Sequence, residues 1–305
     1  MATTIEAEGL VKTYPKGVAA LDGLSFSVPA GTVFALLGPN GAGKSTAVKI
    51  LTTLTLPDGG RASVAGIDVA VSPDRVRRQV GVVAQGSGVD VQATGRENLR
   101  LQGQLHGLRG RSLSQRVGDL LDRFGLTDAA DRVARTYSGG MQRRLDIAMA
   151  MVHDPQVLFL DEPTTGLDPE ARAEMWDGIA GLQKTVLLTT HYLEEADRLA
   201  GTVAIVDHGR IVASGSPDEL KAQLRGDSIQ VEVSGEVDGA LEGLGLRDVM
   251  VEGGVLHARA DDGGRAVPAV LQALEARGLA VASVRVARPS LDDVYLQHTG
   301  RTLTR

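Results

Sequence analysis

A run of glycines and small polar residues near the N-terminus has the composition of a phosphate-binding loop. It reads Gly-Pro-Asn-Gly-Ala-Gly-Lys-Ser-Thr and fits the pattern G-x-x-x-x-G-K-S. Glycines let backbone N–H groups surround phosphate oxygens without Cβ clashes, and the following helix start favours an anion. In this pattern Lys44 reaches the β- and γ-phosphates and Ser45 places its hydroxyl on Mg²⁺. We therefore expect a nucleoside triphosphate and Mg²⁺ to be bound by Gly38, Pro39, Asn40, Gly41, Ala42, Gly43, Lys44, Ser45 and Thr46.

Three more reactive side chains stand at the ends of apolar runs. Asp161 and Glu162 follow the run 157–160, and His191 follows the run 185–190. In α/β proteins, ligands bind where the carboxyl ends of parallel strands meet. Asp161 suits Mg²⁺ through its oxygens, and Glu162 can accept a proton from an attacking water. Two adjacent carboxylates are costly to bury unpaired, so we expect Asp161 to hold the metal and Glu162 to be catalytic. His191 stands at the same sheet edge and is expected to be catalytic as well.

Three other positions each fit two interpretations. Tyr14, ahead of the loop, either stacks on adenine or caps a turn. Gln85, at the end of the expected strand 80–84, either coordinates Mg²⁺ or a water, or caps the loop that follows. Gly139-Gly140 stands before an expected helix. This pair either forms a second backbone cradle for an anion or belongs to a plain loop with Ser138 as N-cap.

The elements that must position these residues follow from hydrophobic patterning. Apolar runs predict buried parallel strands, and apolar residues at helical spacing predict helices packed on one face. The expected strands are 32–37, 80–84, 157–160 and 185–190, with helices over 46–54 and 143–152. Alternation before residue 37 predicts short strands and turns, and residues 95–150 read as a helical insert in an α/β domain.

Composition excludes several classes of protein. With 305 residues, 43% hydrophobic and 23% charged, the chain has room for one large globular domain and a small one. A net charge of −6 gives no basic field for nucleic acid, and the absence of cysteine excludes disulfides and thiolate sites. The apolar runs are far shorter than the about 20 residues that span a bilayer, and no signal peptide is visible. We expect a cytoplasmic chain that is soluble when isolated.

The remaining residues, 228–305, predict a small α+β domain. Strands are expected at 228–233 and 279–286, with a helix between them over 266–277. A last helix is expected after Pro289, with Ser290 as its N-cap. The sequence shows no catalytic cluster in this segment.

With its motifs in this order, the chain resembles the ATP-binding subunit of an ABC transporter over about residues 4–225. The resemblance implies an α/β P-loop NTPase domain with an antiparallel β subdomain and a helical insert. It places this domain at 1–227, with the helical subdomain at about 86–150, followed by the α+β domain at 228–305.

The resemblance also implies a role for each motif residue. Tyr14 stacks on adenine, and Gln85 is the Q-loop residue near Mg²⁺. Asp161 is the Walker B carboxylate, which holds Mg²⁺ through water, and Glu162 is the general base. His191 is the switch histidine that touches the γ-phosphate.

Two further motifs imply a homodimer that encloses two ATP molecules. The signature contacts ATP held by the second copy and comprises Ser138, Gly139, Gly140, Met141 and Gln142. Tyr137 and Met141 depart from the usual L-S-G-G-Q, while the central Ser-Gly-Gly is intact. Asp168 is the D-loop residue.

The tail, Ser290–Tyr295 followed by Thr299-Gly300-Arg301, and the stretch Thr94–Leu99 resemble drug-export ATPases of the daunorubicin-resistance type. That branch implies a separate membrane subunit, a peripheral location on the cytoplasmic face of the membrane, and export of drugs or other hydrophobic molecules. A soluble ABC ATPase acting on DNA would need a longer segment between Lys44 and Ser138, and a ribosomal one a second ATPase unit. The tail argues against an importer subunit. Glu162 and His191 together argue against a non-catalytic nucleotide sensor.

Overall fold

The phosphate-binding loop lies between strand β3 (Val33–Leu37) and helix α1 (Lys44–Leu51) in the computed structural model of the chain. The structure describes residues 3–234, 237, 241 and 243–303. The chain divides into two compact units, Met1–Ile211 and Val212–Arg305, which are described separately below. The predicted strand–loop–helix order is confirmed, with the helix starting at Lys44 rather than two residues later.

A six-stranded sheet in the first unit carries the site. Its order is β10-β9-β3-β8-β7-β6, and β3, β6, β7, β8 and β9 pair in parallel. The other strands are β6 (Val80–Val83), β7 (Val157–Asp161), β8 (Thr185–Thr190), β9 (Thr202–Asp207) and β10 (Arg210–Gly215). Every residue of β8 is buried, because helices and loops cover both faces of a parallel sheet. The carboxyl ends of β3, β6, β7 and β8 therefore meet at one edge.

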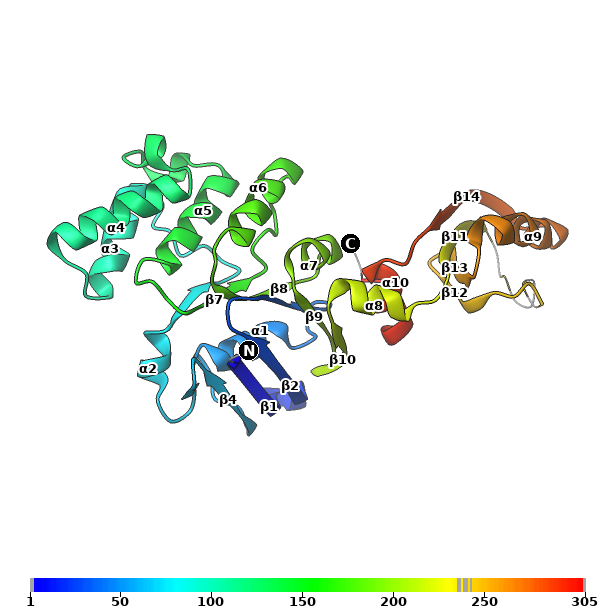
Figure 1. Ribbon diagram of the computed structural model, residues 1–305, viewed down its shortest axis with the longest axis horizontal. Helices are drawn as coiled ribbons and strands as arrows, with labels where there is room; N and C mark the ends of the chain where they lie inside the picture. Colours follow the sequence, from blue (N-terminus) through cyan, green and yellow to red (C-terminus); the bar gives the residue numbers. More distant parts are fainter. Residues whose placement is uncertain (1–2, 235–236, 238–240, 242, 304–305) are drawn as a thin grey trace. The chain divides into compact units, whose positions relative to one another are not determined.

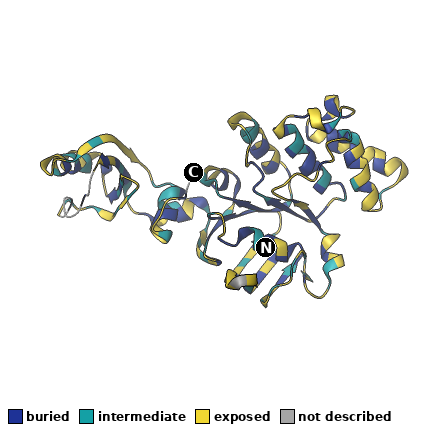
Figure 2. Cartoon of the chain, turned by 180° about the vertical axis from the view of Figure 1, so that it is seen from behind, coloured by how far each residue is buried: buried dark blue, intermediate teal, exposed yellow. Residues whose placement is uncertain are grey.

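A second sheet, antiparallel where its strands pair, packs against α1 and the first sheet. Its order is β2-β1-β4-β5. The strands are β1 (Thr3–Tyr14), β2 (Val18–Pro29), β4 (Gly59–Val64) and β5 (Ile67–Asp68), with a 3-10 turn at Pro15–Gly17. Ile5, Leu21, Phe34 and Ile50 share one buried cluster between the layers. Buried residues, drawn dark blue, follow the central strands of this unit in Figure 2. The predicted antiparallel β subdomain is thus present.

Helices α3, α4 and α5 lie together on one side of the first unit, away from β1, β2 and β4 (Figure 1). The helices of this unit are α2 (Pro73–Arg77), α3 (Gly95–Leu105), α4 (Gly110–Arg123), α5 (Gly139–Ala150), α6 (Pro169–Ala180) and α7 (Leu193–Leu199). Short 3-10 turns occur at Thr127–Ala129 and Ala134–Thr136. The helical insert is therefore confirmed, with one difference. Gly139 and Gly140 form the first turn of α5 instead of preceding the helix.

The second unit contains a four-stranded antiparallel sheet of order β12-β13-β11-β14. Its elements are α8 (Pro217–Gln223), β11 (Asp227–Ser234), β12 (Arg247–Glu252), β13 (Val255–Ala260), α9 (Gly263–Ala276), β14 (Ala280–Ala287) and α10 (Leu291–Thr299). Val231, Leu256, Val270 and Leu274 form the core between the sheet and α9. The α+β prediction is confirmed, although the sequence patterns did not indicate β12 and β13.

The compact units divide between Ile211 and Val212, earlier than the boundary expected between residues 227 and 228. Helix α10 packs on α8, which draws the segment before residue 227 into the second unit. The division falls inside β10 (Arg210–Gly215). As functional domains, 1–227 and 228–305 stay a prediction.

Candidate functional site

Two glycines of the phosphate-binding loop are required by the packing around it. A Cβ atom on Gly38 would lie 2.2 Å from the carbonyl oxygen of Val206. A Cβ atom on Gly43 would lie 2.4 Å from the carbonyl oxygen of Ala20, and the φ of Gly43 is 108°, which L side chains rarely adopt. The loop is therefore held between β2 and β9, and α1 starts directly after it with its N–H groups facing the loop.

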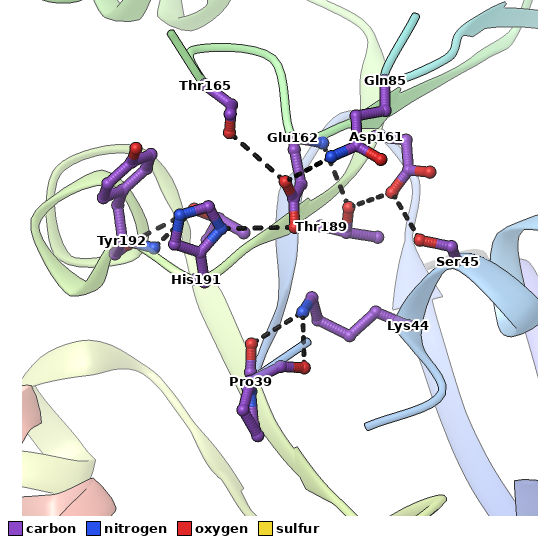
Figure 3. Close-up of polar contacts among 12 residues, drawn as sticks. Pro39, Lys44, Ser45, Gln85, Asp161, Glu162, Thr165, Thr189, His191 and Tyr192 are labelled. Carbon is purple, nitrogen blue, oxygen red and sulfur yellow. Dashed lines mark hydrogen bonds and ion pairs between the residues drawn. The ribbon is translucent and has the colours of Figure 1, made fainter. Parts of the chain in front are cut away.

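Lys44 is 5% exposed and is held inside the loop. Its ammonium donates to the carbonyl oxygens of Gly38 (2.6 Å) and Pro39 (3.0 Å), as Figure 3 shows. The pKa of Lys44 lies below its ordinary value because the ammonium is buried, although the negative charges of Glu162 and Asp161 oppose this shift. The lysine side chain thus lies near two carboxylates at the carboxyl edge of the sheet.

Ser45 and Asp161 provide two oxygen ligands of the kind that Mg²⁺ prefers. The Ser45 hydroxyl lies 3.1 Å from Asp161 Oδ1, and the Thr189 hydroxyl donates to the same oxygen at 2.5 Å. Asp161 and Thr189 are register partners at the ends of β7 and β8, which fixes this contact. Mg²⁺ is usually held by one or two protein oxygens together with substrate phosphates and waters. The donors present fit that requirement.

Glu162 is 8% exposed and is surrounded by polar groups. Its Oε2 accepts from Gln85 Nε2 (3.2 Å) and from the Thr165 hydroxyl (3.3 Å), as Figure 3 shows. His191 Nδ1 lies 3.2 Å from Glu162 Oε1, an ion-pair distance without hydrogen-bond alignment. The φ of Glu162 is 49°, an uncommon conformation for a residue other than glycine. Strained backbone of this kind is concentrated at functional sites.

These residues come from four separate segments and converge at one edge of the parallel sheet. Lys44 and Ser45 follow β3, and Gln85 follows β6. Asp161 ends β7, Glu162 comes directly after it, and His191 follows β8. Two roles were considered for Gln85, namely a ligand of Mg²⁺ or a water, and a cap of the following loop. In the structure its amide nitrogen donates to Glu162, and this contact is compatible with either role. The catalytic and metal roles of all these residues stay predictions.

The signature residues lie elsewhere on the first unit. The Ser138 hydroxyl accepts from the N–H of Met141 at 3.2 Å, so Ser138 is the N-cap of α5. Ser138 and Gly139 are exposed. A Cβ atom on Gly140 would lie 3.1 Å from Cβ of Ala171 in α6. Over the described part of the chain, no hydrogen bond or ion pair links residues 138–142 to the loop 38–46. The start of α5 is thus exposed at Ser138 and Gly139.

Tyr137, one of the two atypical signature residues, points away from this exposed helix start. It is 6% exposed, and its hydroxyl donates to the carbonyl oxygen of Ala129 at 2.6 Å. A Cβ atom on Gly95 would lie 2.3 Å from this hydroxyl, so the glycine makes room for the tyrosine ring. Tyr137 therefore serves packing within the helical subdomain.

Tyr14 and Asp168 were also expected at the site. Tyr14 ends β1 and is half-buried, with the Lys12 ammonium 5.9 Å from its ring centroid. Asp168 is the N-cap of α6, because its carboxylate accepts from the N–H of Ala171 at 2.8 Å. Adenine stacking by Tyr14 and the D-loop role of Asp168 remain predictions.

Three further residues of this region were not expected from the sequence. Thr189 bonds Asp161, and Thr165 bonds Glu162. Arg143 donates to the carbonyl oxygens of both carboxylate residues. A hydroxyl at the end of an apolar strand, as in 185–190, is a signal that could have indicated Thr189. No sequence signal singles out Arg143, because its partners are backbone groups.

Comparison with known proteins gives matches over both units. Residues 21–165 match the ABC transporter family, and residues 215–299 match the family described as ATP-binding protein DrrA1-3-like, C-terminal domain. The chain is 46% identical to the daunorubicin/doxorubicin resistance ATP-binding protein DrrA of Streptomyces peucetius, covering 97% of this chain and 92% of that protein. It is 39% identical to the Nod factor export ATP-binding protein I of Ralstonia nicotianae, covering 98% and 94%.

A solved structure of the ATP-binding subunit of an ABC transporter is also similar. It superimposes with a TM-score of 0.64 at 30% identity, covering 72% of this chain and 92% of that one. Over the described ranges, no helix has the length and apolarity of a membrane span. ATP binding and hydrolysis are the general activity of the matched family. The resemblance drawn from the motifs is confirmed, and the chain belongs to the ATP-binding subunits of ABC transporters, in the exporter branch that carries the DrrA-type C-terminal domain.

Proposed function

We propose that this chain hydrolyses Mg·ATP as a homodimer and thereby drives export by a separate membrane subunit. The observation that supports it most is the convergence of Lys44, Asp161, Glu162 and His191 at one sheet edge. The signature start of α5 lies exposed on the same unit, with no hydrogen bond or ion pair to residues 38–46 within the described part of the chain. Because the loop 38–46 and the signature 138–142 of one copy do not meet, the signature of a second copy completes the ATP site.

In the proposed reaction, the chain binds the triphosphate and positions the attacking water. The N–H groups of the loop 38–46 and the Lys44 ammonium bind the β- and γ-phosphates. Ser45 and Asp161 hold Mg²⁺, with Gln85 nearby, and the metal neutralises charge on the phosphates when bound. Tyr14 stacks on the adenine ring.

Glu162 is the proposed general base. Its carboxylate is fixed by contacts from Gln85, Thr165 and His191, so an oxygen is oriented to accept a proton from water. His191 contacts the γ-phosphate as the bond to the leaving oxygen breaks. Positioning and electrostatic stabilisation supply most of the rate enhancement in phosphoryl transfer.

The second copy supplies the signature. Its Ser138 hydroxyl and the N–H groups of the first turn of its α5 face the γ-phosphate bound by the first copy, and Asp168 lies at the same interface. The buried position of Tyr137 supports this arrangement, since the atypical side chain is kept away from the exposed face. Hydrolysis opens the dimer.

The cargo is proposed to be a drug or another hydrophobic molecule. This follows from the names of relatives, which refer to daunorubicin and doxorubicin resistance and to Nod factor export. The membrane subunit is a separate chain, and this chain binds to it at the cytoplasmic face of the membrane. No nucleic-acid partner is proposed, because the net charge is −6.

The test is hydrolysis of Mg·ATP by the full chain as a function of protein concentration, alone and with a candidate membrane subunit in vesicles. Activity per molecule is expected to rise steeply with concentration. Glu162→Gln is expected to lower kcat by about 10²–10⁴-fold, the usual contribution of a general base. ATP binding and ATP-induced dimerisation, measured by sedimentation, are expected to persist in this variant.

Two results would contradict the proposal. Activity that is linear in concentration and unaffected by any membrane subunit would favour a soluble ABC ATPase. Near-normal turnover by Glu162→Gln would remove this residue from the role of base. Uptake of a fluorescent anthracycline into inverted vesicles, dependent on ATP and on both subunits, tests the cargo class separately.

A further inference from the structure

Arg143 lies on α5, directly after the signature residues 138–142, and faces into the first unit. It is 8% exposed. Its guanidinium donates to four backbone carbonyl oxygens, those of Ala84 (2.7 Å), Pro163 (2.9 Å), Asp161 (3.0 Å) and Glu162 (3.1 Å). These carbonyls belong to two separate segments of the chain. A planar group with several fixed donors can bond both segments at once.

Each bonded carbonyl lies beside a group of the proposed active site. Ala84 directly precedes Gln85, whose amide contacts Glu162. Asp161 and Glu162 are themselves the proposed metal carboxylate and base. Arg143 therefore holds the backbone on both sides of the Gln85–Glu162 contact.

Asp146, one turn further along α5, fixes the other end of the Gln85 loop. It is 7% exposed, and its Oδ1 accepts from the N–H of Gly88 at 2.9 Å. Ala84 and Gly88 enclose Gln85, so α5 bonds this loop on both sides of the glutamine. The carboxylate lies 3.9 Å from the Arg143 guanidinium, which partly compensates two buried charges.

Burying a guanidinium is costly unless its donors are satisfied, and an apolar side chain would fill this space at lower cost.

Arg143 and Asp146 connect the signature to the Gln85 loop mechanically. The signature residues 138–142 begin the same helix, so a displacement of the signature moves Arg143 and Asp146 with it. Both ends of the Gln85 loop and the Glu162 backbone then move together with the signature.

Resting on the proposed hydrolytic function, we propose that Arg143 is a positioning residue for hydrolysis, which, together with Asp146, sets the place of Glu162 and Gln85 relative to the signature of its own chain. It touches neither nucleotide nor water. Its effect is on the orientation of the base and so on kcat, whereas ATP affinity depends on the loop 38–46.

The first test compares steady-state kinetics of Arg143→Gln and Arg143→Lys with the neighbouring control Arg144→Gln. Arg144 is a partly exposed residue that pairs with Glu174 at 3.7 Å. Arg143→Gln is expected to lower kcat by about 10²-fold, the cost of a misplaced catalytic group, with KM for ATP within about threefold. The kcat of Arg143→Lys is expected to lie between those of Arg143→Gln and wild type, because one ammonium cannot bond both segments. Arg144→Gln is expected to match wild type.

Two outcomes of this comparison would overturn the proposal. One is a kcat for Arg143→Gln equal to that of Arg144→Gln. The other is a parallel loss of kcat and of folded protein in both Arg143 variants, with KM and thermal unfolding altered together. That combination is expected of a residue that is needed only for folding.

Asp146 offers a second test that does not depend on Arg143 variants folding. Asp146→Asn keeps an oxygen that accepts from the Gly88 N–H, whereas Asp146→Leu removes it. Faster hydrogen exchange at residues 85–88 and a lower kcat are expected for Asp146→Leu, with both restored in Asp146→Asn. Equal kcat and equal exchange in the two variants would refute the anchoring of this loop by α5.

The two proposals fail in different ways. Absence of hydrolysis by wild type with its membrane subunit would refute the proposed function. The exchange measurement would then still decide whether α5 holds the Gln85 loop, since Arg143→Gln is expected to speed exchange at residues 85–88 with or without turnover. Unchanged exchange in Arg143→Gln would refute the positioning role even if wild type hydrolyses ATP.

Discussion

At the scale of single residues, Thr189 contacts the Asp161 carboxylate and the Glu162 backbone. Its hydroxyl donates to Asp161 Oδ1, and its backbone carbonyl accepts from the Glu162 N–H at 3.1 Å. The Glu162 N–H also lies 3.1 Å from the Thr189 hydroxyl oxygen. Because Glu162 has a strained φ of 49°, these contacts help to hold a conformation that the backbone alone does not favour.

Replacing Thr189 by valine is expected to lower kcat. The variant keeps the shape of the side chain but leaves Asp161 and the Glu162 N–H without the hydroxyl. A hydrogen bond to a charged group contributes about 1.5–3 kcal/mol, which corresponds to a loss of about 10- to 100-fold in kcat. Steady-state ATP hydrolysis by the full chain measures this loss of kcat.

Thr185→Val on the same strand is the matched control. Thr185 is 4% exposed, and its hydroxyl accepts from the N–H of Gly31 at 2.9 Å, at the opposite end of β8. This variant is expected to lose stability but to keep kcat. Equal losses of kcat in the two variants would mean that Thr189 acts through the stability of the strand.

At the scale of elements, two histidines join the end of α3 to the turn after α5. The rings of His106 and His153 stack with centroids 3.8 Å apart and an angle of 2° between their planes. His153 Nε2 lies 3.1 Å from the carbonyl oxygen of Val80. Burial, and then the charge of His106, lower the pKa of His153 from 6.5 to about 4, against a smaller raising effect of the hydrogen bond to Val80.

Stability is therefore expected to fall as the pH falls from about 6.5 to about 4. In this window the unfolded chain binds a proton at His153 that the folded chain does not, so the free energy of unfolding rises with pH. The contribution is roughly 1–2 kcal/mol after allowance for the screening of a half-buried ring. Thermal unfolding between pH 7 and pH 4.5 measures it.

His153→Gln is expected to flatten this dependence, because the amide can still donate to Val80 but does not titrate. The exposed His298 on α10 gives the control, and His298→Gln should retain the wild-type slope. A His153→Gln chain with an unchanged slope would assign the pH dependence to other groups.

At the scale of the whole molecule, the C-terminal tail is part of the fold of the second unit. Leu291, Val294 and Leu296 of α10 are buried, and α10 packs on α8, where Leu220 is also buried. The Ser228 hydroxyl donates to Asp293 at 2.7 Å and joins α10 to β11. The residues that resemble the drug-export branch thus have a structural use within this unit.

Truncation is expected to reveal that α8 belongs to the second unit. A chain ending at residue 227 retains α8 without α10 and exposes Leu220 and Leu224, which are 0% and 5% exposed in the full chain. A chain ending at residue 216 retains β10 and lacks α8. The chain ending at residue 227 is expected to be less soluble than the one ending at residue 216 and to bind more of a hydrophobic dye. The reason is that each exposed leucine forgoes about 1.5–3 kcal/mol of burial free energy.

Equal solubility and dye binding of the two truncated chains would show that α8 is stable without α10. The ATP-binding loop is present in both, so nucleotide binding serves as the control for correct folding of the first unit. If neither binds nucleotide, the comparison is made with the full chain carrying Leu220→Ser.

The sequence by itself determined the phosphate-binding loop, the carboxylates after β7 and the histidine after β8. These are local features, since consecutive residues encode a turn, a cap or a buried strand. Their meeting at one edge followed from the parallel order of the strands. The strands β12 and β13 were missed because Arg247, Asp248 and other polar residues interrupt the apolar pattern.

Only the tertiary structure decided which side chains support the site. Arg143 binds carbonyl groups, which every residue has, so neither its partners nor their convergence can be inferred from side-chain types. Tyr137 fits because Gly95, far away in sequence, leaves room for its hydroxyl. The boundary between the units depends on α10 packing back on α8. Each of these contacts joins segments distant along the chain, and their distance in space is set by packing of the whole unit.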